Sequence, residues 1–334
     1  MWRFVGNDIT IELMERGLEE GRLAHAYLLV GPAHVGKLTL ALDMARALNC
    51  EAEERPCGRC LPCQRIGEEM RHADVVVLCP PSGADIGIDR IRELQHTASL
   101  KPFEGRHRVF IIDGAEALSR EAANCLLKTL EEPPPGVYLI LLATSEGRLL
   151  PTIRSRCQRV ELRPLSGPVV ERFLVEHEHC QPGQAGVLAR LSQGCLGWAV
   201  SAARDDAVLR ERAQRLDELR SLAGADLWER FSYAGRLASG LADDRRSTDD
   251  TLSLWLSWWL DLMRARGGCS EGIVNVDHEA DIRREAERYT IREIVAFIHS
   301  ICRARVELEQ NANPRLALEV LMLDMPHYRE GAAC

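Results

Sequence analysis

The fold of this chain is decided by one stretch, Ala26-Tyr27-Leu28-Leu29-Val30-Gly31-Pro32-Ala33-His34-Val35-Gly36-Lys37. Its first five residues are apolar and predict a buried strand, and the next seven have the G-x-x-x-x-G-K spacing of a phosphate-binding loop. In such a loop the glycines let successive N–H groups turn toward one phosphate, while Lys37 and the start of the next helix add positive charge. The order strand, loop, helix predicts a nucleotide-binding α/β domain.

The magnesium side of this loop departs from the pattern of active enzymes. Leu38 stands where a serine or threonine hydroxyl would reach the cation. Thr39 is the next residue, and one helical position turns a side chain by about 100° away. The candidate nucleotide-binding residues are therefore Gly31, Gly36, Lys37, Leu38, Thr39 and an acidic residue, Asp113.

Asp113 ends an apolar run and could face a cation, but Gly114 follows where many ATPases have a glutamate base. Glu116 lies two residues further on and is expected to point elsewhere. The residues predict a degenerate ATPase site. They leave open whether ATP or ADP binds, and they argue against Mg²⁺ binding and turnover.

A second motif is a cysteine cluster, Cys50-x6-Cys57-x2-Cys60-x2-Cys63. Thiolates at these gaps can converge on one tetrahedral Zn²⁺ ion, and four cysteines close its shell against a catalytic water. The cluster predicts a structural zinc site, with chance free thiols as the alternative. Such a module can also grip nucleic acid, but the glutamates at positions 51, 53, 54, 68 and 69 favour a structural or protein-contact role.

Length and composition limit the classes that remain. The chain has 334 residues, 46% of them hydrophobic and 28% charged, which predicts two or three folded domains and excludes a disordered or fibrous chain. The net charge of −8 argues against a free-standing DNA binder. No apolar run approaches the roughly 20 residues of a membrane span, and the first residues lack an export signal, so we expect a cytoplasmic protein.

The pattern of apolar runs divides the chain in two. Near-continuously apolar runs at 26–30, 74–78, 108–112, 137–143 and 158–162 alternate with helical patterns and predict a parallel sheet with strands buried on both faces. After Arg163-Pro164 the remainder reads as helices. Within 291–302 a helix carries one apolar stripe, which would face a partner or an internal core.

Several blocks together resemble clamp-loader subunits of the AAA+ class. One is Ser155-Arg156-Cys157, in a basic turn that also contains Arg148, Arg154 and Arg159. The other blocks are Ile91-Arg92-Glu93-Leu94, Leu100-Lys101-Pro102-Phe103-Glu104-Gly105, the run 124–134 that ends Glu131-Glu132-Pro133-Pro134, and the run 311–319 that begins Asn311-Ala312-Asn313-Pro314. With the cysteine cluster, they are most similar to the delta-prime class of DNA polymerase III subunits.

The resemblance implies three domains: an AAA+ P-loop domain at 1–164 with the four-cysteine zinc module at 50–63, a helical lid at 165–222, and an all-α collar at 223–334 that joins subunits into a ring. It implies that Arg156 acts in trans as an arginine finger on a neighbouring subunit's ATP. The implied partners are the tau/gamma and delta subunits of a hetero-pentameric ring, and, through the assembled complex, the sliding clamp and primed DNA.

The alternative within the family is a short tau/gamma-like motor subunit with its own ATPase activity. The lid's nucleotide-sensing arginine is expected near 194–199, but Gly197 occupies its position. Leu38, Gly114 and Gly197 favour delta-prime over the motor subunit, and the chain's length points the same way. We expect the chain to have no independent ATPase activity. The resemblance implies that it is a component of the DNA-directed DNA polymerase (nucleotidyltransferase) holoenzyme.

Overall fold

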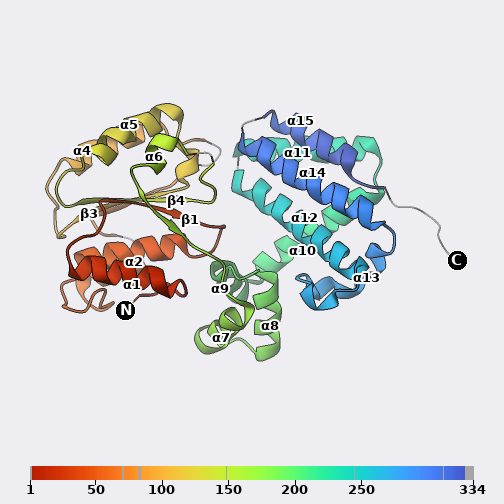
Figure 1. The fold of residues 1–334 in the computed structure, drawn as a ribbon, viewed down its shortest axis with the longest axis horizontal. Helices are drawn as coiled ribbons and strands as arrows, with labels where there is room; N and C mark the ends of the chain where they lie inside the picture. Colours follow the sequence, from red (N-terminus) through yellow and green to blue (C-terminus); the bar gives the residue numbers. More distant parts are fainter. Residues whose placement is uncertain are drawn as a thin grey trace. The chain divides into compact units, whose positions relative to one another are not determined.

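The computed structural model describes residues 2–69, 71–81, 84–147, 149–243, 245–310 and 312–327. The chain forms two compact units (Figure 1). Unit 1 comprises Met1–Leu165 together with Cys195–Gly197, and unit 2 comprises Ser166–Gly194 and Trp198–Cys334. Of the residues predicted to carry function, Arg148 and Asn311 lie outside the described part of the chain.

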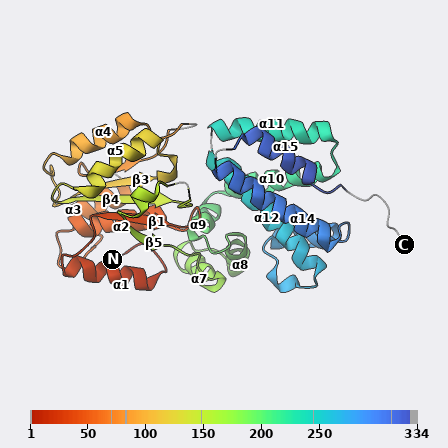
Figure 2. The same cartoon turned by 45° about the horizontal axis from the view of Figure 1, so that its top comes forward.

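Unit 1 is built on a five-stranded parallel sheet with the order β2-β3-β4-β1-β5. Figure 2 labels β1, β3, β4 and β5. The strands are β1 (Ala26–Val30), β2 (Val75–Leu78), β3 (Arg108–Asp113), β4 (Val137–Ala143) and β5 (Gln158–Glu161). β4 lies between β3 and β1, with Ala26 opposite Leu139 in the ladder. The order brings the ends of β3, β4 and β1 to one edge of the sheet.

Helices cover both faces of this sheet, with α1 and α2 on one face and α4, α5 and α6 on the other (Figure 1). The helical segments are α1 (Asp8–Glu19), α2 (Lys37–Asn49), α3 (Leu61–Gln64), the π-helical η1 (Arg65–Glu69), α4 (Ile88–Ala98), the 3₁₀ turn η2 (Ala115–Ala117), α5 (Arg120–Glu131) and α6 (Pro151–Arg154). Two apolar clusters fill the space, one against each face of the sheet. The predicted parallel α/β domain is therefore confirmed.

The expected burial on both faces fails for the two edge strands, and three of the four residues of β2 are only half-buried. Residues of β1 and β4 are buried almost throughout, whereas three of the four residues of β5 are exposed. β5 pairs only with β1 and forms an edge of the sheet. An edge strand with charged side chains is a common way to prevent pairing with another chain, which accounts for Arg159 and Glu161 there.

Unit 2 is helical, as the sequence predicts. Its segments are α7 (Gly167–His177), α8 (Pro182–Leu191), α9 (Leu196–Arg204, whose first two residues belong to unit 1), α10 (Asp206–Gly224), α11 (Leu227–Asp243), α12 (Arg245–Arg266), the 3₁₀ turns η3 (Ser270–Gly272) and η4 (Val276–His278), α13 (Glu279–Ala286), α14 (Ile291–Glu309) and α15 (Pro314–Asp324). Its core contains three fully buried tryptophans, Trp255, Trp258 and Trp259. In the part of the chain that the structure describes, none of the helices is long and apolar enough to cross a membrane.

The apolar stripe of α14 serves the internal core. Ile294 and Ile298 are buried beside Phe297 and Ile301, whereas Ile291 and Cys302 at the ends of the expected stripe are exposed. The packing thus selects the internal alternative. The borders at 164/165 and 222/223 stay predictions, and α10 runs across the second of them.

Candidate functional site

The phosphate-binding loop connects β1 to α2 at the sheet edge where the parallel strands end. Gly36 has a φ of 101°, a left-handed conformation that glycine adopts without strain. The Lys37 ammonium is buried and donates to the carbonyl oxygens of Gly31 at 2.6 Å and Pro32 at 2.7 Å. In this conformation the lysine is held by its own loop.

Residues Cys195–Gly197 lie against this loop and belong to the same unit. The Gly197 N–H donates to the His34 carbonyl oxygen at 2.9 Å. An added Cβ at Gly197 would lie 2.8 Å from that oxygen, closer than side-chain carbons approach. The position expected for a nucleotide-sensing arginine is therefore in direct backbone contact with the phosphate loop, and a larger residue would have to displace it.

The candidate residues on the magnesium side of the loop differ in how far their side chains are buried. Leu38 packs against the apolar cluster under the loop, and Thr39 is exposed. Asp113 ends β3 and Gly114 follows it in a left-handed turn, so the predicted acidic residue does lie at the same sheet edge as the loop. β4 separates β3 from β1.

Two residues at this edge carry a contact that the sequence did not predict. One Glu116 carboxylate oxygen accepts hydrogen bonds from the Thr144 N–H at 3.1 Å and the Thr144 hydroxyl at 2.6 Å. Thr144 follows Ala143, whose carbonyl accepts from the Gly31 N–H at 3.2 Å. Glu116 is thus fixed one strand from the phosphate loop. A threonine directly after an apolar strand, and an acid after the preceding one, are the signals that could have identified the pair.

The four cysteines of the second motif converge in space. Their sulfur atoms all lie within 4.8 Å of one another, and Cys50 Sγ is 3.9 Å from Cys60 Sγ. Sulfurs bound at about 2.3 Å to one tetrahedral Zn²⁺ lie about 3.8 Å apart, so the arrangement fits that ion. The N–H groups of Cys57 and Cys60 donate to the sulfurs of Cys50 and Cys57 at 3.4 Å, which stabilises thiolates.

The thiol pKa values diverge across the cluster. The backbone N–H groups of Arg59 and Cys60 lower the pKa of Cys57 to about 6, although partial burial opposes them. Burial raises the pKa of Cys63 to about 12. A bound cation would stabilise the thiolate form of both. Glu51, Glu53 and Glu54 beside the cluster are exposed and place negative charge on its surface.

Two arginines of the basic turn, Arg156 and Arg159, form ion pairs with acidic residues, which reduces the positive charge of the turn. Arg156, two residues after α6, pairs with Glu131 of α5 at 2.6 Å and donates to the Thr152 carbonyl oxygen at 3.0 Å. Arg159 pairs with Glu146 at 2.9 Å and with Glu161 at 3.2 Å. Arg156 keeps about a third of its side-chain surface exposed to solvent.

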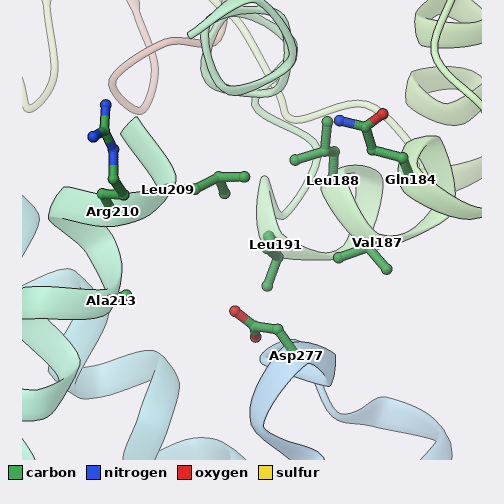
Figure 3. Close-up of a pocket in the computed structure, with 8 residues that line it drawn as sticks. All are labelled: Gln184, Val187, Leu188, Leu191, Leu209, Arg210, Ala213 and Asp277. Atoms are coloured by element: carbon green, nitrogen blue, oxygen red, sulfur yellow. The ribbon is translucent and has the colours of Figure 1, made fainter. Parts of the chain in front are cut away.

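Unit 2 carries an apolar groove with a cavity volume of about 330 Å³ (Figure 3). α8 and α10 supply most of its walls, and Asp277 of η4 lies close to Leu191. Its lining residues are Gln184, Val187, Leu188, Leu191, Leu209, Arg210, Ala213 and Asp277. The groove contains none of the predicted site residues.

Comparison with known proteins covers both halves of the chain. The model of the family described as "DNA polymerase III, delta subunit" matches residues 6–166, and that described as "DNA polymerase III, delta subunit, C terminal" matches 209–327. The chain is 29% identical over 314 residues to DNA polymerase III subunit delta' of Bacillus subtilis, covering 94% of each chain. It is 37% identical over 205 residues to DNA polymerase III subunit tau of Escherichia coli, covering 59% of this chain and 31% of tau.

Among solved structures, the DNA polymerase III gamma subunit-related protein of Thermotoga maritima aligns with a TM-score of 0.43 and 16% identity, over 94% of this chain and 97% of that one. The sequence matches, rather than this alignment, identify the relatives. The two family models begin before α1 and end after α15, and residues 167–208 lie between them. The chain belongs to the clamp-loader family of DNA polymerase III subunits.

Proposed function

We propose that the chain is a delta-prime-like subunit of the clamp-loader complex, which helps to load the sliding clamp onto primed DNA without hydrolysing ATP itself. The observation that carries this proposal is the contact between Gly197 and the phosphate loop. The Gly197 N–H lies 2.9 Å from the His34 carbonyl oxygen and leaves no space for an arginine over the loop. Leu38 and Gly114 remove a cation ligand and a general base as well.

The chain's own chemical contribution is Arg156, acting on the ATP of a neighbouring subunit. A guanidinium stays protonated at every cellular pH, and its planar fork can hold two phosphate oxygens at once. Positive charge placed there stabilises the charge that develops on the transferred phosphoryl group. The partial exposure of the Arg156 side chain, which pairs with Glu131, supports this role.

The remaining assignments follow from membership in the family. The partners are the tau/gamma and delta subunits of a hetero-pentameric ring, with clamp and primed DNA reached through the assembled complex in the cytoplasm. The four-cysteine cluster binds one structural Zn²⁺ ion, since its closed shell of thiolates leaves no position for a catalytic water.

Steady-state ATP hydrolysis by the isolated chain in the presence of Mg²⁺ tests the proposal, with Lys37→Ala as the background control. We expect the two proteins to give the same rate. A Lys37-dependent rate would overturn it and show that the loop can open and bind a cation without the missing hydroxyl.

The second candidate is a short tau/gamma-like motor subunit. It is favoured by the 37% identity to tau over 205 residues and by Glu116, whose carboxylate is fixed at the sheet edge by Thr144. If Glu116 replaces the missing base, Glu116→Gln should abolish any Lys37-dependent hydrolysis. The same variant should leave a silent chain silent.

A further inference from the structure

The cysteine cluster and the phosphate loop are joined by one helix. Gly36 is the N-cap of α2, and Cys50 follows its last residue as the C-cap. Asp43 and Arg46, on the middle and last turns, are fully buried and form an ion pair at 2.7 Å. Breaking a buried pair of this kind is strongly destabilising, because it leaves a buried charge without its partner.

At the loop end, this pair holds the N-terminal segment. Asp43 accepts hydrogen bonds from the N–H groups of Arg3 at 2.6 Å and Phe4 at 2.8 Å. The Phe4 ring is buried directly beneath the phosphate loop, where an added Cβ at Gly36 would lie 3.0 Å from its Cε2 atom. Phe4 therefore supports the residue whose left-handed conformation closes the loop.

At the cluster end, Arg46 touches the metal-binding segment. An added Cβ at Gly58 would lie 3.1 Å from Arg46 Nη2, and Cys63 Sγ lies 4.0 Å from the Arg46 carbonyl oxygen. Gly58 sits between Cys57 and Cys60, so its position depends on the convergence of the four sulfurs. The segment proposed to bind the metal therefore also covers the Arg46 guanidinium and excludes water from it.

We propose that metal occupancy of the cluster formed by Cys50, Cys57, Cys60 and Cys63 controls the order of the phosphate loop, through Gly58, Arg46, Asp43, Phe4 and Gly36. Metal binding in such a segment is folding energy, so metal loss loosens residues 50–63 and uncovers Arg46. Water then competes for the ion pair and for the bonds from Asp43 to the N-terminal segment. Phe4 then loses the hydrogen bond from its N–H to Asp43, and Gly36 loses the packing of the Phe4 ring beneath it. The inference does not depend on whether the loop binds nucleotide.

Hydrogen exchange of the full chain, loaded with Zn²⁺ or stripped with a chelator, tests the proposal directly. We expect metal removal to speed exchange of the amides at 31–37 by about tenfold, in addition to those at 50–63. Peptides from α14 in unit 2 should not change. Unchanged exchange at 31–37 in the stripped protein, with 50–63 exposed, would overturn the proposal.

The variant Phe4→Leu distinguishes coupling through Phe4 from a general loosening of unit 1 on metal loss. It keeps the backbone N–H that Asp43 binds, but it removes the ring atoms under Gly36. Its loop should exchange fast with or without metal, while 50–63 still responds to the chelator. Met14→Leu is the matched control, because Met14 is buried to the same degree in the same apolar cluster and lies outside the route. It should keep the wild-type response.

The coupling must also run in reverse, because linkage between two sites is reciprocal. Phe4→Leu should bind Zn²⁺ about tenfold more weakly than the wild type in equilibrium competition with a chromogenic chelator, and Met14→Leu should not. Equal Zn²⁺ affinity of Phe4→Leu and the wild type, or a wild-type loop response in Phe4→Leu, would refute the proposed route.

Discussion

Arg156 shows how a charged side chain can be both fixed and available. One Nη donates to a backbone carbonyl and the other pairs with Glu131, yet a third of the side chain faces solvent. An exposed pair of this kind contributes at most about 1 kcal/mol, so a phosphate group can compete for the guanidinium at little cost. The contacts orient the side chain without trapping it.

We therefore expect Arg156→Ala to leave this chain folded and to lower ATP turnover by the reconstituted clamp loader at least about tenfold, because a transition-state charge loses its partner. Arg156→Lys should lose nearly as much, since an ammonium cannot hold two oxygens at once. The exposed Arg154 on the same turn supplies the control, and Arg154→Ala should keep full turnover. Normal ATP turnover by a clamp loader that contains the Arg156→Ala chain would exclude the arginine-finger role of Arg156.

Gly197 gives a second prediction at the scale of one residue. Gly197→Ala places a Cβ 2.8 Å from the His34 carbonyl oxygen, so α9 or the loop must shift, and we expect a loss of about 1 to 3 kcal/mol in unfolding free energy. Gly183, also in a helix, has open space around it. Gly183→Ala should be neutral or stabilise by up to about 1 kcal/mol. Urea unfolding compares the two, and equal stability would mean that the contact is loose.

Among the elements, the connection between α4 and β3 is ordered by a single buried carboxylate. Asp74 accepts hydrogen bonds from the N–H groups of Phe103, Glu104 and Gly105 at 2.7 to 2.8 Å and pairs with Arg108 at 3.0 Å. Burial alone would raise the pKa of Asp74, but these donors outweigh it and hold the pKa below its ordinary value. The loop has its shape because this carboxylate is ionised.

The pKa of Asp74 is lower in the folded state, so its contribution is present at neutral pH and is lost as the pH falls below about 4. We expect Asp74→Asn to lose about 3 kcal/mol at pH 7, and the difference from wild type to shrink as the pH falls through that range. Urea unfolding at several pH values measures it. Asp85→Asn, at an exposed position, should show neither effect. A pH-independent difference would contradict the assignment.

The elements themselves were largely predictable, because their signals are local. The strands at 26–30 and 137–143 match β1 and β4 to the residue, since apolar runs bounded by turn residues specify both type and ends. β5 was found by the same signal, but its exposure depends on its place in the sheet order. Likewise, a stripe on α14 could not show by itself whether core or partner covers it.

The candidate site was predictable in its motifs and unpredictable in its contacts. Four cysteines at fixed gaps predict a metal site, and the structure brings their sulfur atoms within 4.8 Å of one another. The contacts of Gly197 with His34, Glu131 with Arg156, and Gly58 with Arg46 join residues that are separated in the sequence. They follow from the tertiary packing of elements, which no local pattern encodes.

For the molecule as a whole, the two units differ in what stabilises them. Unit 1 has a sheet that is covered on each face by an apolar cluster, and it also contains the four-cysteine cluster. Unit 2 has one helical core around its tryptophans and a fully buried arginine, Arg230. Arg230 of α11 donates to the carbonyl oxygens of Leu222 and Ala223 at the end of α10 and of Met325 after α15.

These differences predict separate responses to two substitutions. Arg230→Met keeps the volume but leaves buried carbonyls without donors, so it should destabilise unit 2 by about 3 kcal/mol. Cys60→Ser removes a metal ligand and should act on unit 1. Five of the six tryptophans lie in unit 2, so fluorescence reports on that unit while Zn²⁺ release reports on the other.

In urea, Arg230→Met should shift the fluorescence transition to lower concentration with unchanged Zn²⁺ retention in buffer, and Cys60→Ser should lose Zn²⁺ with little change in the fluorescence transition. Separate cores unfold separately when few contacts cross between them, and two-state behaviour then holds for each unit rather than for the chain. If both variants shifted both signals equally, the chain would unfold as one cooperative body. The metal would then stabilise the helical half as strongly as the half that binds it.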